Sequence, residues 1–433
     1  MKKIIKELVK NPLFSGSLVM ILGSNSVSFI NYLYHLIVGR MLGPSGYGEL
    51  ASLISIIGLL GIIPASSNLV IIKYISQEKD SKKMASLIGW LKTKVLMASI
   101  FFISIIFILS PFISSFLKIS NFFYLWLIAL SFLFSIQSLV NRAILQGLLK
   151  FKEMVISILV ENGTKLFFTT CLILIGLQVG GAMIAYVLAG FIGLYMTNVY
   201  LRSDHKTVHV GILKIKSMLV FTIPVFIQSI STTSIYSSDV ILVKHFFSPH
   251  EAGIYASLST LGKIILFAAG PISGVMFPII SKRKSRGENF KKIFLYSFVA
   301  TFLFGVTICI LYLLFPQFAI RLLFGSAYLE ASNLLIWFGV FIGLFTLSSL
   351  LINFSLSLGK TGVVIFPLIA SIAQIVLILL FHTNLYTIVL ISVLINALLL
   401  LTLLIYLTFG KVLRNERRST NGDKINLNNS PGL

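Results

Sequence analysis

Charged side chains occur inside long apolar stretches of this sequence, where an unpaired charge is costly. Glu161 and Lys165 are four residues apart in one stretch, a spacing that allows an ion pair along one helix. Asp239 lies near the end of a second stretch and Arg142 near the end of a third. Lys263 has no obvious partner in its own stretch; it either pairs across helices, with Asp239 or Glu161, or forms a cationic site for an anionic ligand. Because a charge inside a bilayer costs several kcal/mol unless it is paired or hydrated, these residues are candidates for binding, gating or ion coupling.

Helices that cross a membrane have to hold these side chains. Of the 433 residues, 57% are apolar and only 11% are charged, whereas a soluble chain has about 25% charged residues. A helix needs about 20 apolar residues to cross the hydrocarbon core, and runs of that length fall at 12–36, 48–72, 86–112, 122–147, 154–177, 180–201, 217–242, 254–279, 293–316, 331–356, 362–381 and 385–409. The sequence therefore predicts an all-α integral membrane protein with twelve transmembrane helices.

The net charge of +22 would suggest a nucleic-acid partner in a soluble protein, above all at the basic tract 282–286. Here most of the 35 Lys and Arg residues fall in alternate loops, and only Arg40, Lys118, Lys244 and Arg321 fall on the other side. The positive-inside rule then predicts that both termini are cytoplasmic in a multi-pass protein of the cell membrane. We interpret the basic tract as a loop at anionic lipid headgroups, and we expect no nucleic-acid partner.

A stretch of the sequence is duplicated at an offset of 205 residues. The segment from Val38 to Leu53 resembles the segment from Val243 to Leu258, with the same Val, Pro, Gly and Ala-Ser-Leu at matching positions. Six helices per repeat is an even number, so both halves share one orientation, as in transporters built from parallel repeats. We expect a six-helix lobe at 1–210, a second at 211–410 and a disordered cytoplasmic tail at 411–433.

Polar residues recur on one face of the first, fourth, seventh and tenth expected helices. They are spaced by three and four positions and comprise Ser24, Ser28, Asn31 and His35; Ser131, Ser135, Ser138 and Arg142; Gln228, Thr232, Tyr236 and Asp239; and Thr346, Ser349, Asn353, Ser357 and Lys360. A single Ser or Thr is well explained as a contact between helices. Stripes at matching positions of both halves instead favour a shared polar cavity, lined by Asn31, Gln228, Tyr236 and Asn353.

His35 is a further candidate for gating or ion coupling, because a histidine can titrate near neutral pH. A hydrogen-bonded structural role is the favoured interpretation of this residue.

The sequence lacks the motifs of ATP-driven pumps, of metal sites and of membrane enzymes. It has no GxxxxGK[ST] loop, so the chain is not itself an ATP-driven pump. It has no HExxH motif, and Cys171 and Cys309 lie alone in apolar runs, so we expect no metal, no cofactor and no disulfide framework. The outer acidic residues Glu49, Glu251 and Glu330 stand alone in short loops, which argues against a membrane enzyme and leaves no catalytic residue to propose.

The duplicated loops resemble a known family. The residues from Gly39 to Gly48, GRMLGPSGYG, look like the "GRxLGPxGYG" signature of polysaccharide-biosynthesis (Wzx-type) oligosaccharide flippases, which belong to the multidrug/oligosaccharidyl-lipid/polysaccharide exporter (MOP) superfamily. In the second half, Asp239, Gly253-Ile254-Tyr255 and Pro278 resemble the family pattern "D…L…GxY…P". The resemblance covers the whole twelve-helix chain.

The resemblance implies a two-lobe, V-shaped fold of the MATE type that moves a polyprenyl-(pyro)phosphate-linked oligosaccharide to the outer leaflet by alternating access. It implies a lipid-linked oligosaccharide substrate, and membrane lipids and other glycan-assembly proteins as partners. Arg142, Lys165 and Lys263 would bind the anionic headgroup, and Asp239 and Glu161 would serve in gating or coupling. Three alternatives stay open: a cation-coupled drug antiporter, which generally has acids deep in its cavity; a peptidoglycan-precursor flippase; and a scaffold for glycan assembly.

Overall fold

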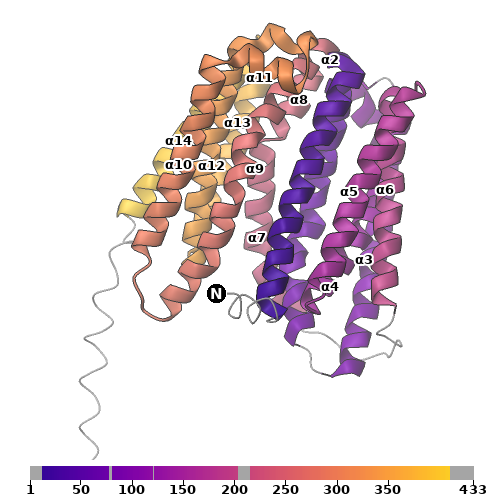
Figure 1. Cartoon of the computed structure of the whole chain (residues 1–433), viewed down its shortest axis with the longest axis vertical. Helices are drawn as coiled ribbons and strands as arrows, with labels where there is room; N and C mark the ends of the chain where they lie inside the picture. Colours follow the sequence, from indigo (N-terminus) through magenta and orange to yellow (C-terminus); the bar gives the residue numbers. More distant parts are fainter. Residues whose placement is uncertain (1–11, 78–79, 120, 203–214, 410–433) are drawn as a thin grey trace, which may run out of the picture. The chain divides into compact units, whose positions relative to one another are not determined.

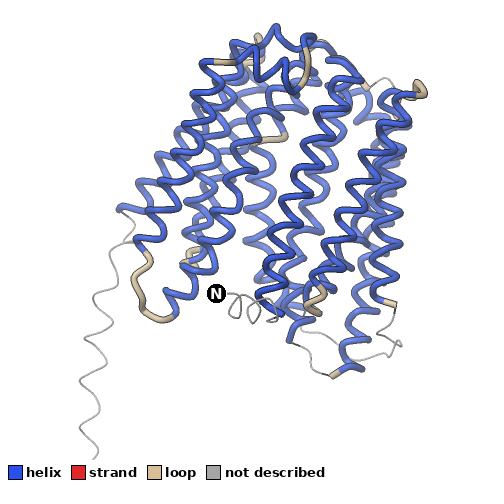
Figure 2. Tube along the Cα trace, viewed as in Figure 1, coloured by secondary structure: helices blue, strands red, loops and turns tan. Residues whose placement is uncertain are grey.

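The computed structural model describes residues 12–77, 80–119, 121–202 and 215–409. In these ranges the chain folds into helices joined by short turns, with no β-strand (Figure 1, Figure 2). The helices are α2 (Pro12–Gln77), α3 (Ser81–Leu117), α4 (Phe123–Gly147), α5 (Phe151–Leu174), α6 (Gln178–Leu201), α7 (Ile215–Ile235), α8 (Ser238–Phe246), α9 (Pro249–Ser285), α10 (Lys291–Leu314), α11 (Pro316–Leu323), η1 (Ser326–Leu334), α12 (Leu335–Ser357), η2 (Thr361–Val364), α13 (Ile365–Leu380) and α14 (Leu385–Phe409). The expected boundary between the lobes at 210–211 and the tail at 411–433 lie outside the described residues.

The first two expected spans are the two arms of α2. The expected loop between them, residues 37–47, is wrong: these residues are helical apart from a kink at Gly43, whose φ is 66°. Glycine adopts this conformation without the Cβ clash that other residues meet, and Pro44 then suits the first turn of the second arm. The kink therefore gives the chain two spans without a long loop.

Ten helices of the described ranges are long and apolar enough to cross a membrane, with both arms of α2 counted as one of them. Since α2 holds two of the expected spans and α7 corresponds to a further one, the structure is consistent with the predicted twelve. The expected seventh span, 217–242, is not continuous, because α7 ends at Ile235 and α8 begins at Ser238. Asp239 stands in the first turn of α8, where a negative charge stabilises a helix N-terminus.

The chain forms two compact units. Unit 1 comprises residues 1–260, 315–333 and 382–385, and unit 2 comprises 261–314, 334–381 and 386–433. In unit 1, α2 packs on α4 and α5, and α6 packs on both α4 and α5. In unit 2, α10 packs on α12, and Phe338, Phe341 and Phe345 of α12 are fully buried.

The basic tract 282–286 contacts the C-terminal end of α12 in unit 2 through Lys284. Lys284 Nζ donates a hydrogen bond to the carbonyl oxygen of Leu358, which follows α12. Arg283 Nη1 donates to the carbonyl oxygen of Asn289 at 2.8 Å, and the Arg286 guanidinium lies 3.8 Å from Glu288 Oε1. A cation near a helix C-terminus interacts favourably with the last carbonyl groups, so Lys284 has a structural role at the end of α12.

The duplicated segments have equivalent local structure. Ser52 Oγ donates to the carbonyl oxygen of Glu49 at 2.8 Å, and Ser257 Oγ donates to that of Ile254 at 2.7 Å. Both serines are fully buried. Matching positions 205 residues apart therefore make the same hydrogen bond and occupy the same kind of environment.

The two copies also meet within unit 1, at a pair of equivalent glycines. A Cβ atom on Gly48 would lie 2.5 Å from the backbone nitrogen of Gly253, and one on Gly253 would overlap the carbonyl oxygen of Pro44. Only glycine allows two backbones to approach so closely. The second arm of α2 and the start of α9 are therefore joined backbone to backbone.

Candidate functional site

Lys165 of α5 is a half-buried cation held by amide oxygens and aromatic rings. Its Nζ donates to Asn31 Oδ1 at 2.7 Å and to Asn162 Oδ1 at 3.1 Å. The same Nζ lies 4.9 Å from the ring centre of Tyr34 and 5.2 Å from that of Tyr186. None of the ion pairs among the described residues involves Lys165. Amides and ring faces stabilise an ammonium group without cancelling its charge.

Backbone and ring contacts hold these partners in place. Asn31 Nδ2 donates to the carbonyl oxygen of Val27 at 3.1 Å, and Asn162 Nδ2 donates to that of Ile158 at 2.9 Å. The rings of Tyr34 and Tyr186 pack edge to face, 6.0 Å apart. The oxygens that bind Lys165 are therefore oriented by the helices that carry them, α2 and α5.

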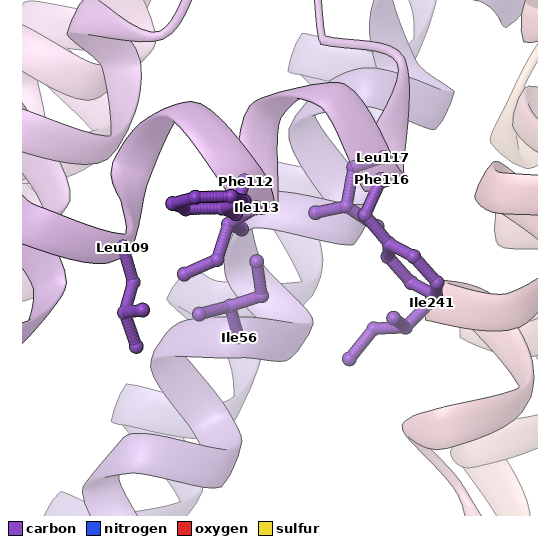
Figure 3. Close-up of a pocket in the computed structure, with 7 residues that line it drawn as sticks. All are labelled: Ile56, Leu109, Phe112, Ile113, Phe116, Leu117 and Ile241. Atoms are coloured by element: carbon purple, nitrogen blue, oxygen red, sulfur yellow. The ribbon is translucent and has the colours of Figure 1, made fainter.

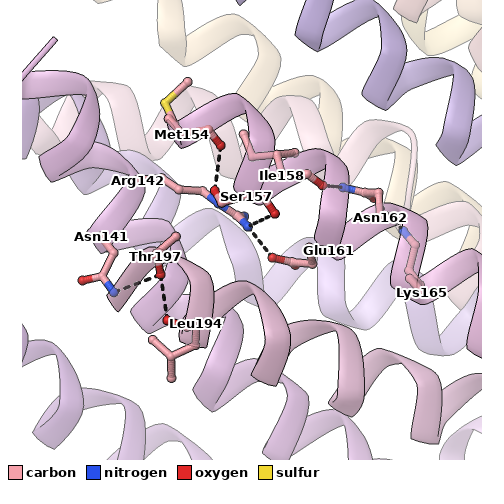
Figure 4. A network of polar contacts seen from close by, with 10 residues as sticks. All are labelled: Asn141, Arg142, Met154, Ser157, Ile158, Glu161, Asn162, Lys165, Leu194 and Thr197. Carbon is pink, nitrogen blue, oxygen red and sulfur yellow. Dashed lines mark hydrogen bonds and ion pairs between the residues drawn. The ribbon is translucent and has the colours of Figure 1, made fainter. Parts of the chain in front are cut away.

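Glu161 forms its ion pair with Arg142 of α4, and among the described residues the pair with Lys165 that the spacing along α5 allows is not formed. Arg142 Nη2 lies 2.5 Å from Glu161 Oε2, and Arg142 Nε donates to Ser157 Oγ at 3.0 Å. In Figure 4, the Glu161 side chain points toward Arg142, and Lys165 extends beside Asn162. Because Glu161 neutralises Arg142, and because the Nε and Nη2 groups of Arg142 donate to Ser157 and Glu161, Lys165 is the stronger candidate for binding an anion.

Gly193 of α6 makes room for this ion pair. A Cβ atom at Gly193 would overlap Glu161 Oε2 and would lie 3.2 Å from Arg142 Nη2. The side chains of Arg142 and Glu161 are 15% and 20% exposed, so their mutual attraction is only weakly screened by water. The ion pair joins α4 to α5 at a place where α6 approaches closely.

Breaking this pair from one side should destabilise the protein strongly. Leaving one partner of a largely buried pair without its counter-charge costs about 3–5 kcal/mol. We expect Glu161→Ala to lower the Tm of the purified protein, and the double variant Arg142→Met/Glu161→Met to regain most of the loss. Thermal unfolding in detergent measures both, and a Tm for Glu161→Ala equal to that of the unchanged protein would rule out a structural role for the pair.

Asp239 is fully buried in unit 1. Its Oδ2 accepts a hydrogen bond from Tyr255 Oη at 2.8 Å, and its Oδ1 accepts one from the backbone nitrogen of Val240 at 2.9 Å. The hydrogen bond with Tyr255 connects α8 to α9. Asp239 therefore has a structural role. Its role in gating or ion coupling stays a prediction.

His35 belongs to a polar cluster near the duplicated segments. Tyr47 Oη lies 3.0 Å from His35 Nδ1 and 2.9 Å from Thr260 Oγ1. Tyr328 Oη donates to the carbonyl oxygen of Gly39 at 2.6 Å, and burial raises the pKa of this phenol well above its usual range. His35 is thus hydrogen bonded within the fold, as the favoured interpretation of the sequence expected.

The remaining predicted residues are divided between the units. Gln228 and Tyr236 are half-buried in unit 1. In unit 2, Lys263 is half-buried in α9, and Asn353 Nδ2 donates to Ser273 Oγ at 3.0 Å. A cavity shared by these four residues with Asn31 and Lys165 stays a prediction.

Three site residues were not identified from the sequence: Tyr34, Tyr186 and Asn162. An aromatic residue in an apolar helix is commonly a core residue, and nothing in the spacing links Tyr186 to Lys165. Asn162 lies three positions before Lys165, and this helical neighbourhood is the one signal that the sequence offers.

An apolar pocket of about 360 Å³ lies elsewhere in unit 1. It is lined by Ile56 of α2, by residues of α3 between Leu109 and Leu117, and by Ile241 of α8 (Figure 3). Its lining has hydrocarbon and aromatic groups only, so it has no group that recognises an anion.

Comparison with solved structures places this fold among membrane transporters. The chain is similar to an inward-facing multidrug resistance MATE family transporter of the MOP superfamily (TM-score 0.70, 15% identity, 90% of this chain and 96% of that one). It is also similar to the lipid II flippase MurJ in an inward closed conformation (TM-score 0.69, 15% identity, 90% and 87%) and to a MOP superfamily transporter from Pyrococcus furiosus (TM-score 0.63, 16% identity, 92% and 96%). The chain therefore shares the helical fold of these transporters, and ten helices of its described ranges are long and apolar enough to cross a membrane.

Its sequence defines the family more narrowly. Residues 37–333 match the family described as "Polysaccharide biosynthesis protein"; the chain belongs to this family, which confirms the resemblance seen in the duplicated loops. A curated relative, an uncharacterized membrane protein of Methanocaldococcus jannaschii, is 27% identical over 280 residues, or 58% of this chain. The match spans 64% of that relative, less than two thirds of its length.

Proposed function

We propose that this protein is a flippase that moves a polyprenyl-(pyro)phosphate-linked oligosaccharide from the cytoplasmic to the outer leaflet of the cell membrane. The substrate would serve the synthesis of polysaccharide or another cell-surface glycan, and transport would proceed by alternating access. Membership of the polysaccharide biosynthesis family and a fold shared with a lipid II flippase support this proposal. Both termini would lie in the cytoplasm, as the distribution of basic residues predicts.

The observation that carries the proposal is the environment of Lys165. Its ammonium group has two amide oxygens and two tyrosine rings around it, and the nearby Glu161 is committed to Arg142. A phosphate or pyrophosphate group would supply the missing counter-charge and accept strong, charge-assisted hydrogen bonds. The hydroxyl and amide groups nearby are suited to the polar part of such a headgroup.

The carboxylates of the site favour this function over a cation-coupled drug antiporter. An antiporter that binds cations needs an acid that can face its cargo or coupling ion. Glu161 is held by Arg142 at 2.5 Å, and Asp239 is fully buried and bonded to Tyr255. Lys165 therefore gives the site around α5 a positive character.

Deletion of the gene tests the proposal in the cell. We expect polyprenyl-linked glycan to accumulate with its sugar on the cytoplasmic side, and re-expression of the protein to restore export. The measurement is the amount of polyprenyl-linked glycan that an external glycosidase can reach. Unchanged glycans together with new drug sensitivity would favour the antiporter and contradict the flippase.

A further inference from the structure

A second basic site lies between α3 and α6, separate from Lys165. It is a pocket of about 470 Å³ lined by Lys92, Tyr195, Asn198 and Arg202, with apolar walls formed by Ala85, Ile88, Val199 and Leu201. This volume is within the range of about 300–1,000 Å³ that is usual for small-molecule sites. A mixed lining of this kind suits a ligand that is polar at one end and apolar at the other.

The polar wall of the pocket is built by a chain of hydrogen bonds. Asn141 of α4 is fully buried, and its Nδ2 donates to Thr197 Oγ1 and to Asn198 Oδ1, both at 3.1 Å. Figure 4 shows Asn141 directed toward Thr197 of α6. Lys92 Nζ then donates to the same Asn198 oxygen at 3.2 Å. The ammonium group is held at the pocket by a neutral amide, so its charge is not cancelled.

The second cation, Arg202, follows the last residue of α6 directly. Among the described residues, no hydrogen bond or ion pair engages its guanidinium group. Asn198 lies four residues earlier, which is about 6 Å along a helix, so the two cations stand at neighbouring depths. The sequences of α3 and α6 contain no Asp or Glu, and neither wall therefore supplies a counter-charge.

The position of the pocket indicates which anion it meets. Lys92 and Arg202 belong to the group of basic residues that the distribution of Lys and Arg predicts to be cytoplasmic. Tyr195, 63% exposed, is of the residue type enriched where lipid headgroups meet hydrocarbon. Basic pockets between membrane helices on this side are suited to anionic lipid headgroups.

We propose that this pocket binds the phosphate headgroup of an anionic membrane lipid of the cytoplasmic leaflet. Lys92 and Arg202 donate to the phosphate oxygens, Asn198 fixes the position of Lys92, and the acyl chains follow the apolar wall. The site is independent of the flippase proposal, because it uses none of the residues around Lys165.

Binding of phosphatidylglycerol to the purified full-length protein tests this site. We expect Lys92→Gln/Arg202→Gln to weaken binding at least tenfold, since hydrogen bonds between a cation and a phosphate are roughly twice as strong as those between neutral groups. The matched control, Lys83→Gln/Lys94→Gln, removes the same charge from exposed positions of α3 and should bind like the unchanged protein. Lys92→Arg should retain binding and shows that a loss in the glutamine variant reflects the missing charge and not a damaged fold.

Three results of the binding experiment would contradict the proposed lipid site. Equal binding by the two double variants would overturn the site. Phosphatidylcholine binding as tightly as phosphatidylglycerol would overturn the preference for an anionic lipid. Displacement of phosphatidylglycerol by inorganic phosphate at equal concentration would show a site for free phosphate in place of a lipid site.

Discussion

Lys165→Ala should reduce glycan export about tenfold to a hundredfold without loss of the folded protein. The ammonium group is the charged donor for the phosphate, and a charged hydrogen bond contributes about 1.5–3 kcal/mol, with about 1.4 kcal/mol for each factor of ten. The measurement is the rate at which polyprenyl-linked glycan appears in the outer leaflet of a deletion strain that expresses the variant.

Lys152→Ala is the matched control for this experiment. Lys152 belongs to the same helix and is exposed, so its removal changes the net charge equally without touching the site. Lys165→Arg keeps the charge and should retain part of the export. Normal export by Lys165→Ala would remove this residue from the mechanism.

Gly253→Ala should destabilise the protein by about 3 kcal/mol, the upper part of the range for overpacked positions. The new methyl group would overlap the carbonyl oxygen of Pro44, and a backbone atom cannot move aside as the end of a side chain can. The second arm of α2 and the start of α9 would have to separate. Thermal unfolding of the purified variant measures the loss.

A glycine with open space around it provides the comparison. A Cβ atom on Gly58, in the same arm of α2, would meet no atom within 4 Å. Gly58→Ala should therefore leave Tm unchanged or raise it slightly, because alanine is the better helix former. Equal Tm values for Gly253→Ala and Gly58→Ala would show that the close contact of the two motif copies does not stabilise this fold.

The sequence predicts the membrane helices well because their signal is local. Twenty apolar residues in a row define a span wherever the helix packs, and the duplication of the segment around Gly48 at Gly253 is visible by simple alignment. The kink in α2 was missed, although Gly43 and Pro44 are a glycine and a proline in succession. The sequence shows that the chain turns there, but not that the helix resumes at once.

The contacts of the charged residues depend on which helices are neighbours. Spacing along α5 suggested a pair of Glu161 and Lys165, but Arg142 of α4 offers Glu161 a pair reinforced by hydrogen bonds to Ser157. Lys165 in turn bonds to Asn31 of α2, which is 134 residues away in the sequence. Spacing within one helix predicts neither the pairing of Glu161 with Arg142 nor that of Lys165 with Asn31. The sequence pattern therefore identifies the charged residues but not their partners.

The most direct measurement is transport by the purified protein in lipid vesicles that contain a fluorescent polyprenyl-pyrophosphate glycan in the inner leaflet. We expect the unchanged protein to bring the glycan into reach of an external glycosidase, and Lys165→Ala to be slower by the factor stated above. A glycan that stays protected in vesicles containing the unchanged, folded protein, under an imposed proton or sodium gradient as well as without one, would contradict the proposed function.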